Sequence, residues 1–213
     1  MMAGSNFLET WKAGRVTVRD GCLFVGDTPA MFEWERPLMG SFAAALEVAG
    51  SDILEIGFGL GIFATEVQSL RPRSHVIVEA HAEIAARARI WAKNFSDITV
   101  LESAWQDVVP RLGPFDAVFY DSFSPDEAIA DDLARLFAEC ARGLLRADGI
   151  VGLFVAGQVL SAATQTAIYR YFDRVEVRIL RDLTPCDRGR SLGFGSKWLM
   201  PILRDVRAEN DKG

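Results

Sequence analysis

Apolar positions follow two different periods along most of the chain. Short apolar runs rich in β-branched residues recur at 53–56, 75–78, 98–101, 115–120 and 149–155, and each predicts a buried parallel strand. Between these runs, apolar residues recur three or four positions apart, as on one face of a helix. Strands that alternate with helices indicate an α/β fold, in which helices cover both faces of a mostly parallel sheet.

The two ends of the chain extend this pattern. A helix over 162–171 and strands over 175–180 and 197–203 bring the expected sheet to seven strands. Ahead of the sheet, residues 15–25 alternate around Asp20-Gly21, which predicts a β-hairpin. We therefore divide the chain into an N-terminal hairpin segment over 1–30 that acts as a lid, one α/β domain over 31–206 and a frayed tail over 207–213.

Composition and charge narrow the classes of function. Half of the 213 residues are hydrophobic, which suits one domain with a sizeable core, and the formal net charge is -6. A negative chain is a poor match for a phosphate backbone, so nucleic acid is not an expected partner. No apolar run is long enough to span a membrane. Cys22, Cys140 and Cys186 lack metal-type spacing, so we interpret them as free thiols of a cytoplasmic protein without a metal site.

The first buried run ends in a glycine-rich turn. Gly57, Gly59 and Gly61 leave the backbone free to adopt positive φ angles and let a ligand approach it closely. Glu79 ends the next strand, where a carboxylate can accept hydrogen bonds from ribose hydroxyls. These residues predict a site for a nucleoside cofactor. The alternative is a turn that only closes a strand–helix unit.

The spacing of the glycines discriminates between nucleoside cofactors. Dinucleotide-binding folds prefer a small residue at the position that Ile62 occupies here, which counts against a nicotinamide-dependent oxidoreductase. A G-x-G-x-G turn followed by an acidic strand end instead resembles the Rossmann-like class I methyltransferases, whose cofactor is S-adenosylmethionine (SAM).

Further candidate residues follow from the expected sheet. Asp121 ends a buried strand on the rim where ligands bind, whereas Asp116 lies at the other end of that strand and is assigned to structure. Asp121 could instead cap the next helix, although Ser124 already suits that role. Trp105 follows another strand, where it either forms a wall of an adenine slot or packs in the core. His81 is interpreted as a surface residue.

Four segments together resemble one family. Residues 34–39 are similar to the W-E-x-P-x-M segment of guanidinoacetate N-methyltransferase and of the related protein arginine δ-N-methyltransferase. The turn at 54–59 resembles that family's L-E-(V/I)-G-F-G, residues 105–108 its W-x-D-V, and residues 115–121 its F-D-x-x-x-Y-D. The likeness runs in order from Met31 to Leu203.

This resemblance implies a SAM-dependent N-methyltransferase that acts on a guanidino nitrogen and releases S-adenosylhomocysteine. Glu35 and Asp121 would be the catalytic residues, because two carboxylates can accept the N–H donors of a planar guanidinium and one can take its proton. The expected cofactor contacts are Glu55, Gly57, Phe58, Gly59, Gly61, Glu79, Ala80, Ala104, Trp105 and Asp121. The expected substrate contacts are Trp34, Glu35, Asp121, Ser122, Ala156 and Gly157.

Two departures from the family pattern bear on the acceptor. The guanidinoacetate enzymes have an L-T-S type turn that binds the substrate carboxylate, whereas the corresponding residues here are Val155-Ala156-Gly157-Gln158. The chain also has no ankyrin-type extension, which favours a small guanidino compound over a protein side chain. We expect a monomer or a homodimer. Methylation of another amine or amidine, and a catalytically silent SAM-binding partner protein, remain the alternatives.

Overall fold

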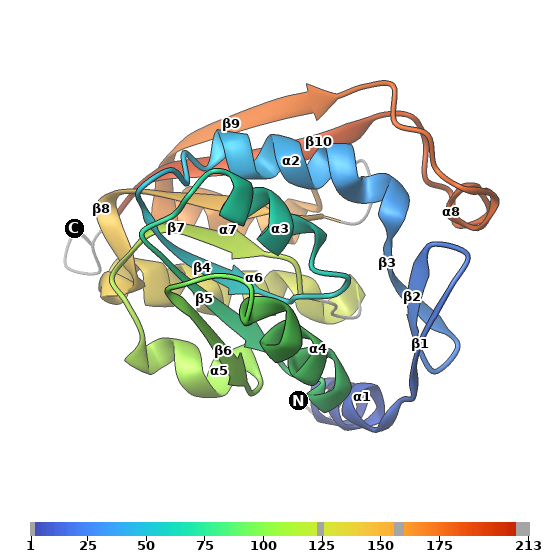
Figure 1. The fold of residues 1–213 in the computed structure, drawn as a ribbon. Coiled ribbons are helices and arrows are strands. Elements are labelled where there is room, and N and C mark those ends of the chain that lie inside the picture. Colours follow the sequence, from blue (N-terminus) through green and yellow to red (C-terminus); the bar gives the residue numbers. More distant parts are fainter. Residues whose placement is uncertain (1–2, 123–125, 156–159, 208–213) are drawn as a thin grey trace.

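A seven-stranded sheet forms the centre of the molecule. The computed structural model describes residues 3–122, 126–155 and 160–207. The strand order is β6-β5-β4-β7-β8-β10-β9, and only β10 runs antiparallel to its neighbours (Figure 1). The strands are β4 (Asp52–Ile56), β5 (Ser74–Glu79), β6 (Ile98–Glu102), β7 (Phe115–Tyr120), β8 (Leu145–Leu153), β9 (Phe172–Leu180) and β10 (Trp198–Val206). The expected α/β class and mostly parallel seven-stranded sheet are confirmed.

Two hydrophobic cores, one on each face of the sheet, account for the continuous apolar runs. Neighbouring residues of a strand point to opposite faces, so Ile53 lies in one core and Leu54 in the other. The first core includes α2 (Arg36–Ala45), α3 (Ile62–Ser69) and α4 (Ala82–Ala92). The second includes α5 (Trp105–Val108), η2 (Val109–Arg111), α6 (Asp126–Glu139), η3 (Cys140–Leu144) and α7 (Ala162–Tyr171).

The N-terminal segment forms a separate small sheet beside the main one (Figure 1). Strands β1 (Val16–Arg19) and β2 (Cys22–Val25) form the expected hairpin, and β3 (Thr28–Phe32) adds a third antiparallel strand that runs across the expected boundary at residue 30. Two α-helices were not anticipated. These are α1 (Ala3–Ala13), which precedes the hairpin, and α8 (Asp187–Ser191), which lies between β9 and β10.

Several element ends differ from expectation by a few residues. Strands β8, β9 and β10 are longer than the apolar runs that predicted them, because polar residues also pair along their edges. Ser124, the expected helix cap, lies outside the described residues, and α6 begins at Asp126. Pro37 sits in the first turn of α2, directly after the short helix η1 (Glu33–Glu35). None of the described helices is both long and apolar enough to cross a membrane.

Candidate active site

A cavity of about 220 Å³ lies at the carboxyl ends of the parallel strands. Its floor comes from residues that follow β4, β5, β6 and β7, the edge where ligands bind in open α/β sheets. Its other walls come from both ends of the chain. Leu8 and Trp11 of α1 and Leu23 of β2 contribute on one side, and Leu192 and Phe194 contribute after α8.

The structure brings most of the expected site residues to this cavity. Its lining includes Glu35, Gly57, Gly59, Glu79, Ala80, Trp105, Asp121 and Ser122. Five other expected residues, Trp34, Glu55, Phe58, Gly61 and Ala104, do not belong to the lining. Ala156 and Gly157 lie outside the described residues, so their expected contacts stay predictions.

The glycine turn requires glycine for two physical reasons. Gly57, Gly59 and Gly61 have φ values of +94°, +56° and +71°, a region that side chains disfavour. The backbone is also crowded there. A Cβ on Gly57 would stand 2.2 Å from the carbonyl oxygen of Asp121, and a Cβ on Gly59 would stand 2.6 Å from Sδ of Met31. The turn therefore packs directly against β7 and the N-terminal segment.

Glu79 is held rigidly at the end of β5. The backbone N–H of Phe58 donates to Oε2 at 2.9 Å, and that of His81 donates to Oε1 at 2.8 Å. Burial raises the pKa of this carboxyl, and the backbone donors oppose that shift. Each carboxylate oxygen can accept a second hydrogen bond. The residue thus retains acceptor capacity for hydroxyl groups of a ligand in the cavity.

Glu35 and Asp121 place two further acids in the same cavity. Glu35 ends η1 and is only 4% exposed, so burial, reinforced by the charge of Asp121, raises its pKa well above the usual range. Burial, reinforced by Glu55 and Glu79, raises the pKa of Asp121 to about 8. No lysine, arginine or histidine occurs among the described lining residues. The cavity therefore favours a cationic ligand, whose charge would stabilise the ionised acids.

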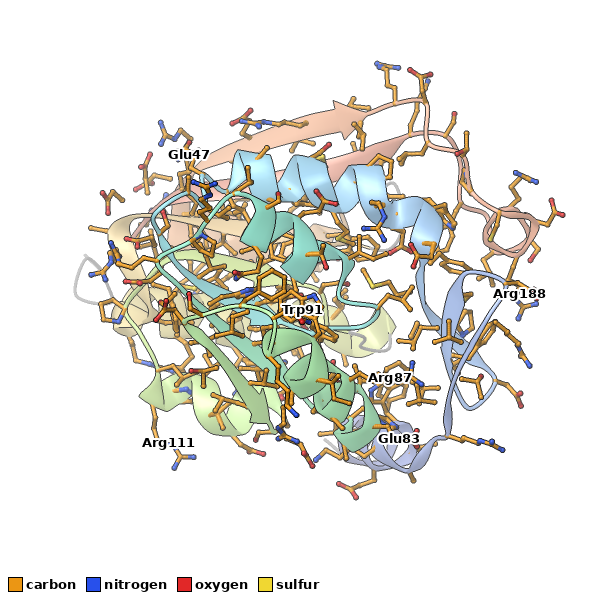
Figure 2. All side chains as sticks on the ribbon, in the orientation of Figure 1. Glu47, Glu83, Arg87, Trp91, Arg111 and Arg188 are labelled. Carbon is orange, nitrogen blue, oxygen red and sulfur yellow. The ribbon has the colours of Figure 1, made fainter. Side chains whose placement is uncertain are left out.

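His81 is not the surface residue expected from the sequence. It is 2% exposed, and its Nε2 lies 2.7 Å from the carbonyl oxygen of Gly14 at the end of α1. Its Nδ1 accepts from the backbone N–H of Glu83 at 3.2 Å, so Nε2 carries the hydrogen that reaches Gly14. Figure 2 shows Glu83 and Arg87 at the end of α4 that faces α1. His81 thus ties the N-terminal segment to the helix that follows Glu79.

Glu55 lies behind the turn, where it faces another histidine. Its Oε2 lies 2.8 Å from Nε2 of His75, and both side chains are almost completely buried. Burial, together with the charge of Glu79, raises the pKa of Glu55, and burial lowers the pKa of His75 to about 3. Burial disfavours the charged form of each group, and the pair lies in a supporting position under the cavity floor.

An aromatic wall, which sequence patterns did not reveal, closes one side of the cavity. Phe32, Phe154 and Phe194 line it. The rings of Phe32 and Phe194 lie 6.0 Å apart edge to face, and Trp198 supports both Phe154 at 5.1 Å and Phe194 at 5.4 Å. Trp34 packs behind the same wall, 5.7 Å from Phe194. The high aromatic content of residues 194–198 is the only sequence signal that could have suggested this wall.

Trp105 packs in the core and also reaches the cavity, and its expected contact with an adenine stays a prediction. Its ring is buried against Tyr120 at 6.0 Å, yet it also lines the cavity. Within the described part of the chain, no three His, Cys, Asp or Glu side chains are arranged to hold a metal ion.

Comparisons with known proteins show which family the chain resembles in sequence. The family profile described as "Guanidinoacetate N-methyltransferase" matches residues 1–183. "Protein arginine N-methyltransferase 2" of Eremothecium gossypii is 36% identical over 135 residues, which cover 58% of this chain and 32% of that protein. The protein of the same name from Saccharomyces cerevisiae is 30% identical over 189 residues, covering 83% of this chain and 43% of that protein.

A likeness to a solved structure supports the fold. The M. jannaschii protein TYW2, solved in complex with AdoMet, superimposes with a TM-score of 0.57 at 13% identity and covers 92% of this chain and 87% of that one. At that level of identity the likeness concerns the fold alone. This chain spans less than half of the length of the two curated relatives.

Proposed function

Because the chain belongs to the guanidinoacetate N-methyltransferase family, we propose that it is a SAM-dependent N-methyltransferase whose acceptor is the guanidino nitrogen of a small guanidino compound. The observation that carries the proposal is the pair Glu35 and Asp121, which line one cavity that has no cation among its described residues. A guanidinium matches this pair in both charge and geometry, since it is planar and offers N–H donors in fixed directions.

The cavity also has groups suited to the cofactor. Glu79 would accept hydrogen bonds from the ribose hydroxyls, Gly57 and Gly59 would let the cofactor lie against the backbone, and Trp105 would form one wall for the adenine. Bound SAM supplies an electrophilic methyl group on a sulfonium centre. Gly57 of the glycine turn packs closely against Asp121, which supports one continuous site for the cofactor and the acceptor.

Glu35 and Asp121 would address the poor reactivity of the acceptor. A guanidinium nitrogen is a weak nucleophile because its lone pair is delocalised. Two carboxylates fix the plane of the group, which aligns one nitrogen for transfer. A carboxyl that retains affinity for a proton, as the raised pKa of Asp121 indicates, can then accept the proton that this nitrogen releases.

A second acceptor can be tested by the same experiments. The relatives named protein arginine N-methyltransferase 2 make a peptide arginine the second candidate. The sequence departures that favour a small molecule do not involve Glu35 or Asp121, so either acceptor would use the same two acids.

The proposal is tested by neutralising each acid in turn. We expect Asp121→Asn to lower turnover of the best guanidine by about 10²–10⁴-fold, because it removes the proton acceptor and places an N–H donor where an acceptor is needed. Glu35→Gln should lose more in substrate affinity. S-adenosylhomocysteine release measures both, and SAM affinity should change far less.

Glu33→Gln is the matched control. Glu33 lies two residues from Glu35 in η1, but its carboxylate is exposed and pairs with Arg36 at 2.9 Å. This variant should keep nearly normal turnover. Near-normal turnover of Asp121→Asn, or a loss confined to SAM affinity, would show that Asp121 does not bind the acceptor, and the same outcome for Glu35→Gln would exclude Glu35.

A further inference from the structure

Strand β9 leaves one long edge of the main sheet open. It pairs with β10 on one side and is the last strand of the sheet, so no other described strand pairs with its outer side (Figure 1). All residues from Asp173 to Ile179 are exposed. An open edge presents backbone N–H and C=O groups that can pair with a further strand.

The features that usually protect such an edge do not occur in β9. Its nine residues include no lysine, proline or glycine. Its pairing with β10 keeps a single register from Phe172 to Leu180, so no bulge turns the strand away. The opposite edge of the sheet is different, because β6 has only five residues and its Glu102 pairs with Arg89. The edge of β9 is therefore the better template for pairing.

One face of β9 carries an apolar strip. Val175, Val177 and Ile179 form this strip and are 36%, 45% and 51% exposed. Residues directly opposite each other in an antiparallel pair share a face of the sheet. Leu203, which lies opposite Val175, belongs to the second core. The apolar strip thus extends the second-core face of the sheet into solvent.

The other face of β9 carries charges of alternating sign. Arg174, Glu176 and Arg178 follow each other along it. Glu176 and Arg178 lie 2.5 Å apart between Oε1 and Nε, and both side chains are 45% exposed. Arg174 pairs with Asp205 on β10 at 3.2 Å. Glu176 and Arg178 therefore offer one charge of each sign beside the open edge.

A second copy of the chain matches this edge when β9 pairs with itself in an antiparallel register. With a two-fold axis through Val177, Val177 lies opposite its own copy and Val175 lies opposite Ile179 of the second copy. The same register places Glu176 opposite Arg178 of the second copy, and symmetry repeats this pair. Both faces of the strand are then complementary.

The neighbouring registers are not complementary. An axis through Glu176 or Arg178 places that charge opposite its own copy, which is unfavourable. An axis through Val175 places the carboxylate of Asp173 opposite the apolar side chain of Val177. The sequence of β9 therefore favours the register centred on Val177.

We propose that two copies of the chain pair through β9 in this register and form a dimer with one continuous sheet. No residue of β9 belongs to the described cavity lining, so each copy keeps its own site, and the proposal does not depend on the proposed function. Two strand edges make a small interface, so we expect a modest affinity, with a Kd of about 10 µM.

Sedimentation equilibrium of the purified full-length protein from about 1 to 100 µM tests the proposal. The mass should rise from the 23.5 kDa of one chain towards twice that value. We expect Val177→Lys to weaken the dimer by at least about 10-fold, because it places two cations against each other on the axis. Val18→Lys is the matched control. Val18 is 48% exposed on β1, an edge strand of the small sheet, and its variant should dimerise normally.

A charge swap tests the register itself. Glu176→Arg and Arg178→Glu should each weaken the dimer by at least about 10-fold, because like charges then face each other across the two copies. The double variant that carries both substitutions restores opposite charges and should dimerise as the wild type does. All these side chains are exposed, so the variants should fold normally, which circular dichroism checks.

Hydrogen exchange supplies a reading that does not depend on mass. Exchange over residues 173–179 should be slower at about 100 µM than at about 1 µM in the wild type, and equally fast at both concentrations in Val177→Lys.

Three outcomes would overturn the proposal. A monomer throughout the concentration range would leave the edge of β9 to an extended segment of another protein. A dimer that Val177→Lys and both single charge variants leave intact would have its interface elsewhere. A double variant as weak as the single ones would rule out the pairing of Glu176 with Arg178.

Discussion

The three acidic residues of the cavity have no cationic side chain beside them among the described lining residues. Burial raises the pKa values of Glu35, Glu79 and Asp121, which means that ionising them is unfavourable until a cation arrives. Binding of a guanidinium would reverse this and release protons from the site. The same residues therefore link ligand affinity, stability and pH.

The first prediction concerns Asp121 and stability. The unfolded chain loses this proton near its usual pKa of 3.8, whereas the folded protein keeps it until about pH 8. The folded state thus binds more protons over that interval, and the free energy of unfolding falls as pH rises through it. The asparagine of Asp121→Asn cannot ionise, so above pH 8 this variant should be more stable than the wild type by about 1–3 kcal/mol. A completely buried carboxyl would give a larger difference in stability, but the Asp121 side chain is partly exposed to the cavity. Thermal unfolding of both proteins from pH 4 to 9 measures this, and parallel pH profiles would contradict it.

A second prediction concerns Glu79 and the cofactor. Replacing Glu79 with Ala should weaken SAM binding by about 1–3 kcal/mol, because charge-assisted hydrogen bonds are lost. The matched control is Glu102→Ala. Glu102 is the register partner of Glu79 on β6, but it is exposed and pairs with Arg89. Calorimetry should show a clear loss for the first variant only, and equal SAM affinity in both would remove Glu79 from the cofactor site.

Local sequence patterns identified the candidate site residues that lie at the carboxyl ends of strands. Glu79 and Asp121 each follow an apolar run, so the parallel sheet brings them to one rim. Glu35 could be found only through the family resemblance, because its position depends on how the N-terminal segment docks. His81 was misjudged because its partner is the backbone carbonyl of Gly14, 67 residues away in sequence. Every residue has a backbone carbonyl, so the sequence alone does not indicate which distant carbonyl a histidine contacts.

At the scale of elements, the contact between α1 and the start of α4 helps to position the residues that line one side of the cavity. Helix α1 supplies Leu8 and Trp11 to the lining, and the hydrogen bond from His81 to Gly14 fixes its end. The carbonyl of Gly14 has little freedom, since a Cβ at this glycine would stand 2.6 Å from Cγ1 of Val25. The hydrogen bond from His81 therefore adds a directional contact to the packing of Trp11 against the first core.

A third prediction follows from this contact. His81→Ala should increase hydrogen exchange over residues 3–13, because α1 loses the donor that holds its end. Glu83→Ala, on the same turn of α4, keeps the His81 contact and should leave exchange in α1 unchanged. Equal protection of α1 in both variants would mean that packing of Leu8 and Trp11 alone holds the helix.

The elements that the sequence predicted well are those buried on one or both sides. Strands β4, β5, β6, β7, β8 and β10 contribute residues to the two cores, which accounts for their apolar runs. Strand β9 was also expected, although most of its residues are exposed. Helices α1 and α8 were missed for a different reason. Helix α8 has five residues and α1 eleven, and neither has the strong cap and long apolar face that identified α6.

At the scale of the whole molecule, the cavity is enclosed by the two ends of the chain around a central sheet. Leu8 and Trp11 come from before the sheet, and Leu192 and Phe194 come from between its last two strands. These walls are small elements with few partners, whereas the floor belongs to the buried sheet. Differences in local stability of this kind are typical of segments that move when ligands bind.

The fourth prediction is that the N-terminal segment acts as a lid. Residues 3–30 should exchange hydrogen more slowly when S-adenosylhomocysteine and the best guanidine are both bound, because a filled cavity gives Trp11 and Leu8 additional contacts. Strands β4 and β5 serve as internal references that should change little. Identical exchange over 3–30 with and without both ligands would exclude lid closure.

The packing of Gly57 has a consequence for how such a protein can diverge. A Cβ on Gly57 would stand 2.2 Å from the carbonyl oxygen of Asp121, so the two backbones leave no space for even one methyl group. Any larger residue at Gly57 must displace the end of β7, and with it the acid proposed for the acceptor. A change that adapts the protein to a new cofactor therefore alters the acceptor chemistry in the same step.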